Sequence, residues 1–333
     1  MRDHDPSALE SFVSENEREI EFQKYVQYLF FTQWKGLRDY ANGKGISIIG
    51  DMPIYVSLDS ADIWACREDY LLDSDGKPIK VAGVPPDRFS SSGQLWGNPI
   101  YNWSKMKENG FKWWQERYRA ASALYDVIRI DHFIGIVNYY AIPASDGDAV
   151  NGEWQRGPSY ELIEAIKECN GAMIIAEDLG NVTDEVRELM NDAGYPGMRI
   201  LQFGLDDPPD NLHSMKNCPE NCIAYGGTHD NETLRGFVSR MGDGERRRIM
   251  ELSGAPSTDE RALTESLIRL GLESRASIAI FQLQDYLMLG NEARINLPST
   301  LGGRNWRWTL GDTADRLDAV IPLISALTES SGR

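Results

Sequence analysis

Four short apolar segments of this chain each end in an acidic residue, and this pattern limits the possible folds more than any other feature. The acids are Asp51, Asp131, Glu177 and Asp230, and loop-like sequence follows each of them. The preceding segments have the length and composition of buried strands. Parallel α/β folds place their chemistry at the carboxyl ends of the strands, so these acids are candidate catalytic groups. We expect acid/base chemistry or a carboxylate nucleophile.

Helical and strand-like segments alternate along the chain, which implies an α/β fold with a parallel sheet and helical crossovers. The segment 57–110 breaks this alternation with prolines, glycines and ordered aromatics, as a functional loop does. No Gly-x-Gly-x-x-Gly follows a strand, so a dinucleotide site is not expected. Helices are predicted over 8–42, 104–124, 158–169, 183–193, 231–240 and 258–271, and strands over 46–50, 126–131, 172–177, 197–203, 222–227 and 277–283.

The overall composition is that of a soluble globular protein, with 41% hydrophobic and 26% charged residues. The net charge of −17 argues against nucleic acid or an anionic membrane surface as partner. The first residues lack the apolar core of a signal peptide, and no apolar run is long enough for a membrane span, so we expect a cytoplasmic protein. The four cysteines lack a zinc-site spacing, which predicts reduced thiols and no metal.

The segment Arg129-Ile-Asp131-His132 places three polar residues at the end of an apolar strand. Arg129 and Asp131 are two residues apart and therefore point to the same face of the strand. A guanidinium beside a carboxylate keeps it ionised and orients it. An ionised, oriented carboxylate is what a glycosyl nucleophile must be. A purely structural ion pair at a strand end explains the same residues equally well.

Two further acidic segments are candidates for the same site. Glu177 follows apolar residues, which raise the pKa of a carboxyl group and suit it to general acid/base catalysis. His229 and Asp230 lie at another strand end, where a turn would bring both to the site. The alternative for each segment is a helix cap, by Asp178 in the first and by Asp230 or Asn231 in the second.

The remaining candidates are weaker. Asp51 is expected to support a neighbour rather than to react. Trp96 and Trp103 lie in the long loop, where an exposed aromatic face would stack on a sugar ring, and Asn296 and the 305–308 cluster would supply further sugar contacts. Packing or local structure within the loops is the alternative for the aromatic and asparagine candidates, and a cap on the following segment is the alternative for Asp51.

Taken together, these segments resemble the 4-α-glucanotransferases of the amylomaltase/disproportionating-enzyme family, glycoside hydrolase family 77. The resemblance covers nearly the whole chain, and no other family known to us carries the complete set. The matching segments are Gln27–Trp34, Ile49–Val56, Asp59–Trp64, the loop 82–103, Arg129-Ile-Asp-His-Phe-Ile-Gly135, Ala176-Glu-Asp-Leu-Gly180 and Gly227-Thr-His-Asp-Asn231.

The resemblance implies a retaining (β/α)8 TIM-barrel enzyme that transfers α-1,4-glucan segments between malto-oligosaccharides, with no metal or organic cofactor. By that similarity Asp131 is the nucleophile, Glu177 the acid/base and Asp230 a third carboxylate that binds sugar hydroxyls. The loop-rich insertion 57–110 contains the loop 82–103, which resembles the family's acceptor-side loop and would favour a sugar hydroxyl over water. The substrate-binding residues implied are Arg129, His229, Asp51, Tyr55, Asp87, Phe89, Gln94, Trp96, Asn98, His132 and Asn296.

Two departures from the family pattern stand out. Pro298-Ser299-Thr300 replaces a Pro-Gly-Thr whose glycine suits a positive φ. In the family, two barrel strands and an N-terminal binding region precede the helix at 8–42, so residues 1–333 are expected to form a partial barrel domain of about six βα units with open edges. A catalytically inactive glucan-binding fragment and an α-glucan hydrolase are therefore the alternatives to a transferase.

Overall fold

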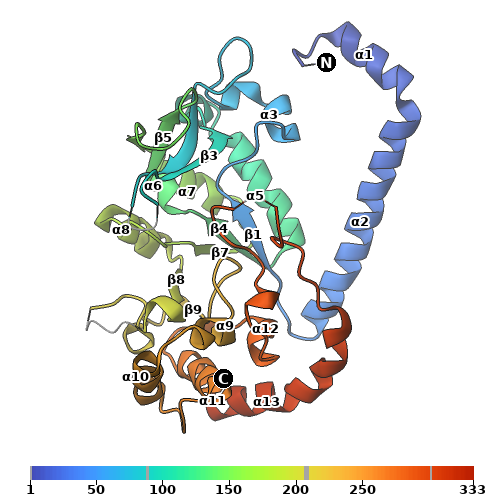
Figure 1. Ribbon diagram of the computed structural model, residues 1–333. Coiled ribbons are helices and arrows are strands. Elements are labelled where there is room, and N and C mark those ends of the chain that lie inside the picture. Colours follow the sequence, from blue (N-terminus) through green and yellow to red (C-terminus); the bar gives the residue numbers. More distant parts are fainter. Residues whose placement is uncertain (1, 88–89, 206–209, 301) are drawn as a thin grey trace. The chain divides into compact units, whose positions relative to one another are not determined.

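Each of two units, Met1–Tyr195 and Pro196–Arg333, contains one three-stranded parallel sheet (Figure 1). The computed structural model describes residues 2–87, 90–205, 210–300 and 302–333. All six parallel strands correspond to strands predicted from the sequence, so the α/β class is confirmed. The first sheet has the order β1-β4-β7, from Ile49–Pro53, Val127–Asp131 and Met173–Ala176, and the second β10-β9-β8, from Ile278–Ile280, Cys222–Tyr225 and Gly197–Ile200.

The helices between these strands largely follow the prediction. The helix expected over 104–124 is divided, because the chain turns at Asn109-Gly110-Phe111, where Phe111 has a φ of 57°. The helices are α3 Ala61–Ala65, α4 Trp103–Glu108, α5 Lys112–Leu124, α6 Ile134–Val137, α7 Tyr160–Lys167, α8 Asp184–Ala193, α9 Leu234–Ser239, α10 Asp243–Ser253, α11 Glu260–Leu272, α12 Leu283–Tyr286 and α13 Leu317–Ser330. Among the described residues, the prediction missed the short helices α3, α6 and α12 and two longer ones, α10, which is rich in arginine, and α13, which has Pro322 inside it.

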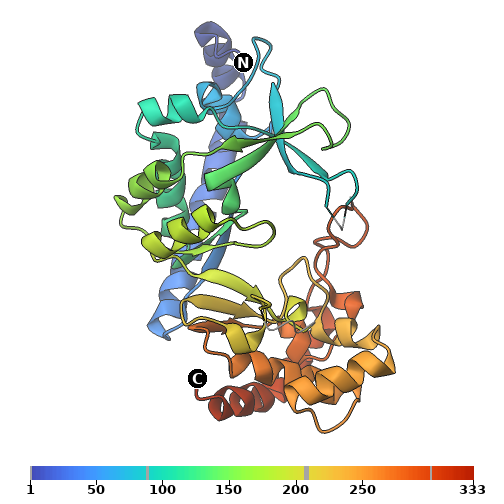
Figure 2. The ribbon, with the colours of Figure 1, turned by 90° about the vertical axis from the view of Figure 1, so that its left-hand side faces the viewer.

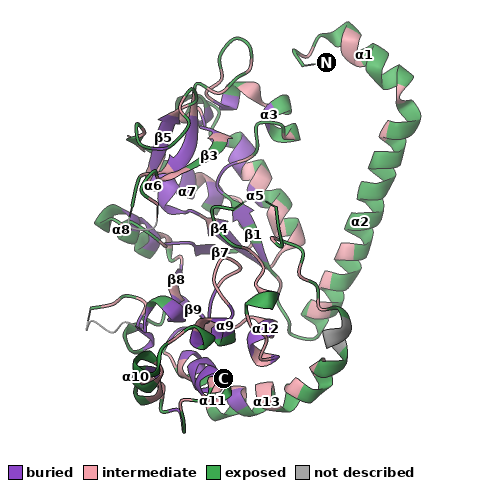
Figure 3. Cartoon of the chain, in the orientation of Figure 1, coloured by how far each residue is buried: buried purple, intermediate pink, exposed green. Residues whose placement is uncertain are grey.

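The helix predicted over 8–42 is two helices, α1 Pro6–Glu15 and α2 Glu17–Gly43, which meet at Asn16. Asn16 leaves the helical conformation with φ −120° and ψ 21°. None of the α2 residues, all of which the structure describes, is buried (Figure 3). Most of its large apolar side chains are therefore exposed rather than packed, namely Phe22, Tyr25, Val26, Tyr28, Leu29, Phe30, Phe31, Leu37 and Tyr40.

The carboxyl-terminal part of α2 is joined to the turn before β4. Arg38 donates from Nε and Nη2 to Asp126 Oδ1, at 2.9 and 2.7 Å. Asp126 Oδ2 accepts the N–H of Ile48 at 2.8 Å and the Asn42 side chain at 2.9 Å. Trp34 Nε1 donates to the Leu124 carbonyl at 2.8 Å. One carboxylate thus joins α2, β4 and the segment leading into β1.

The loop-rich segment 57–110 contains regular structure that the sequence did not reveal. Its strands β2 Lys80–Val84 and β3 Gln94–Pro99 pair antiparallel with each other, and β2 also pairs with β5 Asn138–Pro143. With β6 Glu153–Arg156 they form a four-stranded sheet of order β3-β2-β5-β6 (Figure 2). Glycines and prolines inside these strands obscured the period-two pattern.

Each unit has its own apolar core. In the first, Trp114, Ile128 and Phe133 are fully buried among residues of α5, β4 and the following turn. In the second, Leu263 and Leu267 of α11 pack with residues of β9 and α9. Among the described residues, no helix has both the length and the apolar character needed to cross a membrane.

Candidate active site

Arg129, at the middle of β4, joins two of the predicted acids. Its Nη1 donates to Asp51 Oδ1 and Oδ2 at 2.7 and 2.8 Å, and its Nη2 donates to Asp131 Oδ1 at 2.8 Å. The parallel register places Asp51 directly opposite Arg129 and Pro53 opposite Asp131. Asp51 therefore lies within β1 and not at its end, which corrects the sequence-based assignment. The predicted pairing of Arg129 with Asp131 is confirmed.

The guanidinium of Arg129 is buried, with 9% of the residue exposed. Burial alone would lower the pKa of Arg129, but the carboxylates of Asp51 and Asp131 raise it above its ordinary value. A permanent positive charge therefore lies between two half-exposed carboxylates. The hydrogen bond from this charge holds one oxygen of Asp131 and so fixes the orientation of the other.

Glu177 follows β7 at the level of Asp131, because β4 and β7 are in register up to Ile130 and Ala176. Its Oε2 accepts the N–H of His132 and its Oε1 the N–H of Leu179, both at 2.7 Å. Burial, and then the charge of Asp131, raise the pKa of Glu177 to about 7, although Arg129 and the two N–H groups favour the charged form. The predicted pKa rise is confirmed, and Glu177 can hold or release a proton near neutral pH.

His132 lies in the turn after β4 in the left-handed conformation, with a φ of 52°. Burial lowers the pKa of His132 to about 4, so the ring is neutral near pH 7. Trp96 of β3 packs edge-on against this ring, with 4.8 Å between the ring centroids. The antiparallel sheet thus brings a partly exposed indole next to the residue that follows Asp131.

Of the other predicted sugar contacts in the first unit, two lie next to Trp96 and the other described ones contact other parts of the chain. Tyr55 is buried and stacks on Tyr101, with its ring 6.4 Å from that of Trp96. Gln94 accepts the Trp96 Nε1–H at 3.1 Å, and Asn98 donates to the Val56 carbonyl at 3.0 Å. Asp87 is exposed and accepts the Ser90 N–H at 2.8 Å, while Phe89 lies outside the described residues.

The second unit gathers His229, Asp230 and Asn296. Asn296 Nδ2 donates to Asp230 Oδ1 at 2.7 Å, and the Asn296 N–H donates to the His229 carbonyl at 3.0 Å. His229 Nε2 lies 3.5 Å from Asp230 Oδ2. The imidazole ring packs against the Trp306 ring, with 5.2 Å between the ring centroids. The turn after β9 therefore brings the side chains of His229 and Asp230 together, as predicted, and leaves the second oxygen of Asp230 beside an imidazole.

The helix-cap alternatives are wrong for these acids. The N-cap of α8 is Thr183 and not Asp178, and the N-cap of α9 is Thr233, whose side chain accepts the Gly236 N–H. Capping therefore does not account for Asp178, Asp230 or Asn231.

Sequence reasoning missed Arg294 and Asp285. Arg294 Nη2 donates to the Asp230 carbonyl at 2.5 Å. Asp285 is fully buried and accepts the Leu234 N–H at 2.7 Å. Asp285 lies inside α12, five residues after β10 ends at Ile280, so the pattern of an acid directly after a strand does not mark it.

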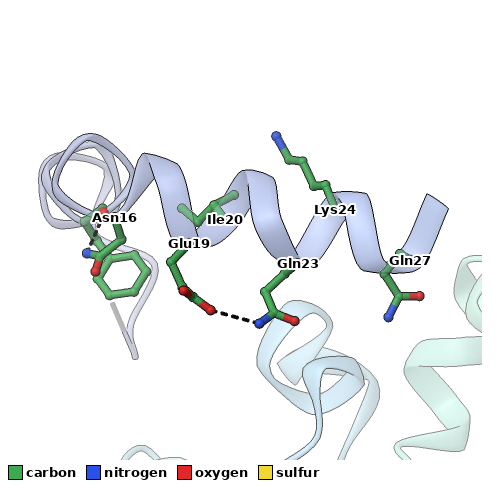
Figure 4. A pocket seen from close by; sticks show the side chains of 7 residues that line it. Asn16, Glu19, Ile20, Gln23, Lys24 and Gln27 are labelled. Atoms are coloured by element: carbon green, nitrogen blue, oxygen red, sulfur yellow. Dashed lines mark hydrogen bonds between the residues drawn. The ribbon is translucent and has the colours of Figure 1, made fainter. Parts of the chain in front are cut away.

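The hollow drawn in Figure 4 lies on α1 and α2, and it contains none of the predicted site residues. Glu19 accepts a hydrogen bond from Gln23 there at 2.9 Å, a neighbouring pair on one helix face. Its lining residues are Phe12, Asn16, Glu19, Ile20, Gln23, Lys24 and Gln27.

A family model described as 4-alpha-glucanotransferase, glycoside hydrolase family 77, matches residues 1–313. The chain belongs to this family. A 4-alpha-glucanotransferase of Clostridium butyricum is 44% identical over 91% of this chain and 62% of its own length, and that of Solanum tuberosum is 41% identical over 98% and 57%. An amylomaltase of Streptococcus agalactiae, solved in complex with acarbose, has a TM-score of 0.93 and 37% identity over 99% of this chain and 66% of its own.

Family membership confirms the resemblance identified from the motifs, and this glycoside hydrolase family 77 chain spans about 60% of the length of the curated relatives it matches. The departure from the family's Pro-Gly-Thr also has a structural consequence. Ser299, where the family has glycine, adopts a φ of 62°, a left-handed conformation that a Cβ disfavours.

Proposed function

We propose that this chain carries the catalytic groups of a 4-α-glucanotransferase that works by retaining double displacement. The observation that carries the proposal is the contrast between two neighbouring strand-end acids. Asp131 accepts a hydrogen bond from a buried guanidinium, whereas burial raises the pKa of Glu177 to about 7. In retaining glycoside chemistry one of two neighbouring carboxyl groups acts as the nucleophile, and the other, whose pKa is raised, acts as the general acid.

In the first step, an Asp131 oxygen attacks the anomeric carbon of an α-1,4-glucan. The bond from that carbon to the leaving oxygen breaks, and Glu177 gives its proton to that oxygen. Two carboxyl groups about 5 Å apart are typical of this covalent route. Arg129 holds the other Asp131 oxygen during the attack.

In the second step, the hydroxyl oxygen of an acceptor sugar attacks the anomeric carbon. Its proton passes to Glu177, and the bond to Asp131 breaks. The product keeps the α configuration, and both residues return to their starting states. A half-exposed aromatic such as Trp96 can stack on an acceptor ring and favour a sugar over water.

We assign Asp230 as the third carboxylate, which binds sugar hydroxyls, and His229 and Asn296 as its neighbours in substrate binding. The match to the family model, which includes the segment Gly227–Asn231, supports this assignment. The hydrogen bond from Asn296 leaves Asp230 Oδ2 available for a hydroxyl. Asp51, Tyr55, Asp87, Phe89, Gln94, Asn98 and His132 are further proposed sugar contacts, and malto-oligosaccharides are the proposed substrates.

We also propose that the six parallel strands are part of a (β/α)8 barrel and that the chain acts in the cytoplasm. Two features support a partial barrel. Within the described sheet, β1 pairs only with β4 and so has an open edge. The apolar residues of α2 are exposed. Sedimentation combined with an activity assay tests this proposal, because a monomer with the turnover of longer relatives would contradict a partial barrel.

Maltotriose distinguishes the three candidate activities. A transferase produces glucose and a ladder of longer oligomers. A hydrolase releases reducing ends without longer products, and an inactive glucan-binding fragment binds maltodextrin in a calorimeter without turnover. We expect the ladder.

The Asp131→Asn variant tests the nucleophile. It should give no covalent sugar by mass spectrometry after acid quenching with an α-glucosyl fluoride donor, whereas the native chain should. Asp39→Asn, which changes an exposed acid on α2, is the matched control and should label like the native chain. A sugar trapped on the Asp131→Asn variant would refute the assignment.

A further inference from the structure

The loop Thr228–Leu234, which carries His229 and Asp230, is held at both ends by one short segment after β10. Gln282 Nε2 donates to the Thr228 carbonyl at 2.7 Å, at the start of the loop. Asp285 Oδ1 accepts the Leu234 N–H at 2.7 Å, where the loop ends and α9 begins. The two contacts bridge more than 50 residues of sequence.

The middle of the loop is held separately. Asn231 Oδ1 accepts the Thr228 N–H at 2.8 Å and the Thr228 hydroxyl at 2.9 Å, which closes a compact turn. Arg294 binds the Asp230 carbonyl and Asn296 binds its carboxylate. Hydrogen bonds therefore link the loop within itself, and separate hydrogen bonds join its two ends to the segment after β10.

Burying the carboxyl group of Asp285 costs free energy that a purely structural contact would not need to spend. It is fully buried, and its Oδ2 has no hydrogen-bond partner among the described residues. Gln282 Oε1 is likewise buried without a partner. Burial raises the pKa of Asp285 to about 7, although the N–H groups of Leu234 and Gln282 favour its charged form. An apolar residue would avoid this desolvation penalty, so packing alone does not explain Asp285.

We propose that Asp285 and Gln282 are positioning residues that fix the loop carrying His229 and Asp230 relative to β9 and α9. Neither residue touches the reacting atoms. Their effect on glycosyl transfer rests on the proposed function, because it acts through Asp230. Their effect on the placement of the loop is independent of the proposed function. Hydrogen–deuterium exchange measures the loop, and kinetics measure glycosyl transfer.

Hydrogen–deuterium exchange of the full chain measures the loop directly. In Asp285→Ala, amides of 228–234 should exchange faster by on the order of 10-fold, since a hydrogen bond to a buried acidic side chain is lost. The peptides of β9 and α11 should keep their native protection. Asp285→Asn keeps an acceptor oxygen for Leu234 and should restore slow exchange, and Glu292→Gln, an exposed acid nearby, is the control.

Unchanged protection of 228–234 in Asp285→Ala would overturn the inference, and so would an equal rise in exchange over the whole second unit. If Asp285→Ala does not fold, Gln282→Ala tests the other contact. It removes the bond to Thr228 at a partly exposed position, and it should loosen 228–231 while α11 stays protected. Native-like exchange in that variant would likewise overturn the inference.

Kinetics with maltotriose give a second readout. Displacement of Asp230 by about 1 Å should lower kcat by about 10²-fold while KM changes little, and Asp285→Asn should restore kcat. Full transfer activity in Asp230→Asn would refute the proposed function. The positioning role would then be tested by the exchange experiment alone. A loop loosened by Asp285→Ala with native kcat would refute the link to catalysis.

Discussion

Replacing Glu177 by glutamine should change how the stability of the protein depends on pH. The pKa of Glu177 in the folded protein is about 7, above its ordinary value of 4.5. The folded state therefore binds this proton more tightly than the unfolded chain. Its contribution to stability is fully present below pH 4.5 and is lost as the pH rises toward 7. Glu177→Gln carries no titrating proton and should lack this loss.

The magnitude follows from the two pKa values. The rise from 4.5 to about 7 corresponds to about 3 kcal/mol, since each pH unit between them is about 1.4 kcal/mol. Between pH 5 and pH 8 the expected change is about 2–3 kcal/mol. The amide has one acceptor oxygen for the N–H groups of His132 and Leu179, which costs about 1–3 kcal/mol at both pH values and cancels in the comparison.

Urea unfolding of the native chain and of Glu177→Gln at pH 5 and pH 8 measures this effect. Groups that titrate in both proteins, including His132, cancel when the two pH differences are subtracted. The native chain should lose about 2–3 kcal/mol more than the variant between pH 5 and pH 8. A difference below about 0.5 kcal/mol would show that burial does not raise this pKa, and the acid/base role would lose its physical basis.

Three further substitutions, one of them with a matched control, test the packing, the backbone strain and the hydrogen bonds of the first and second units. Gly50→Ala would place a Cβ 2.1 Å from the Tyr125 ring and should cost about 1–3 kcal/mol in urea unfolding, whereas Gly36→Ala on α2 meets nothing within 4 Å and should be neutral or stabilising. Ser299→Gly relieves a left-handed residue and should raise stability by about 0.5 kcal/mol, and an equal loss would show that the Cβ is not strained there. Asp126→Ala should speed proteolysis and exchange over 34–43, and unchanged protection would refute its role in joining α2 to β4.

The alternation of apolar strands and amphipathic helices was readable from sequence, because it depends on local periodicity. All six parallel strands of the described residues were located to within a few residues, and the acids Asp131 and Glu177 stand at the ends of two of them, as expected. Periodicity gave wrong or missing elements where single polar residues, glycines or prolines interrupt a helix or strand pattern. The helix predicted over 8–42 breaks at Asn16, and the glycines and prolines of 82–99 concealed two strands.

The sequence by itself placed Asp131 and Glu177 at strand ends, since hydrophobic patterning shows where a strand gives way to a loop, but it misplaced Asp51, which lies within β1. Only the tertiary structure decided which acidic side chains form an ion pair with which basic one. Asp51 faces Arg129 because β1 and β4 pair in one register, and that register is set by contacts between residues 78 positions apart. The pKa of Glu177 depends on what surrounds it, and the roles of Gln282, Asp285 and Arg294 depend on hydrogen bonds to a loop distant in sequence. Such long-range pairings leave no periodic signal in a single chain.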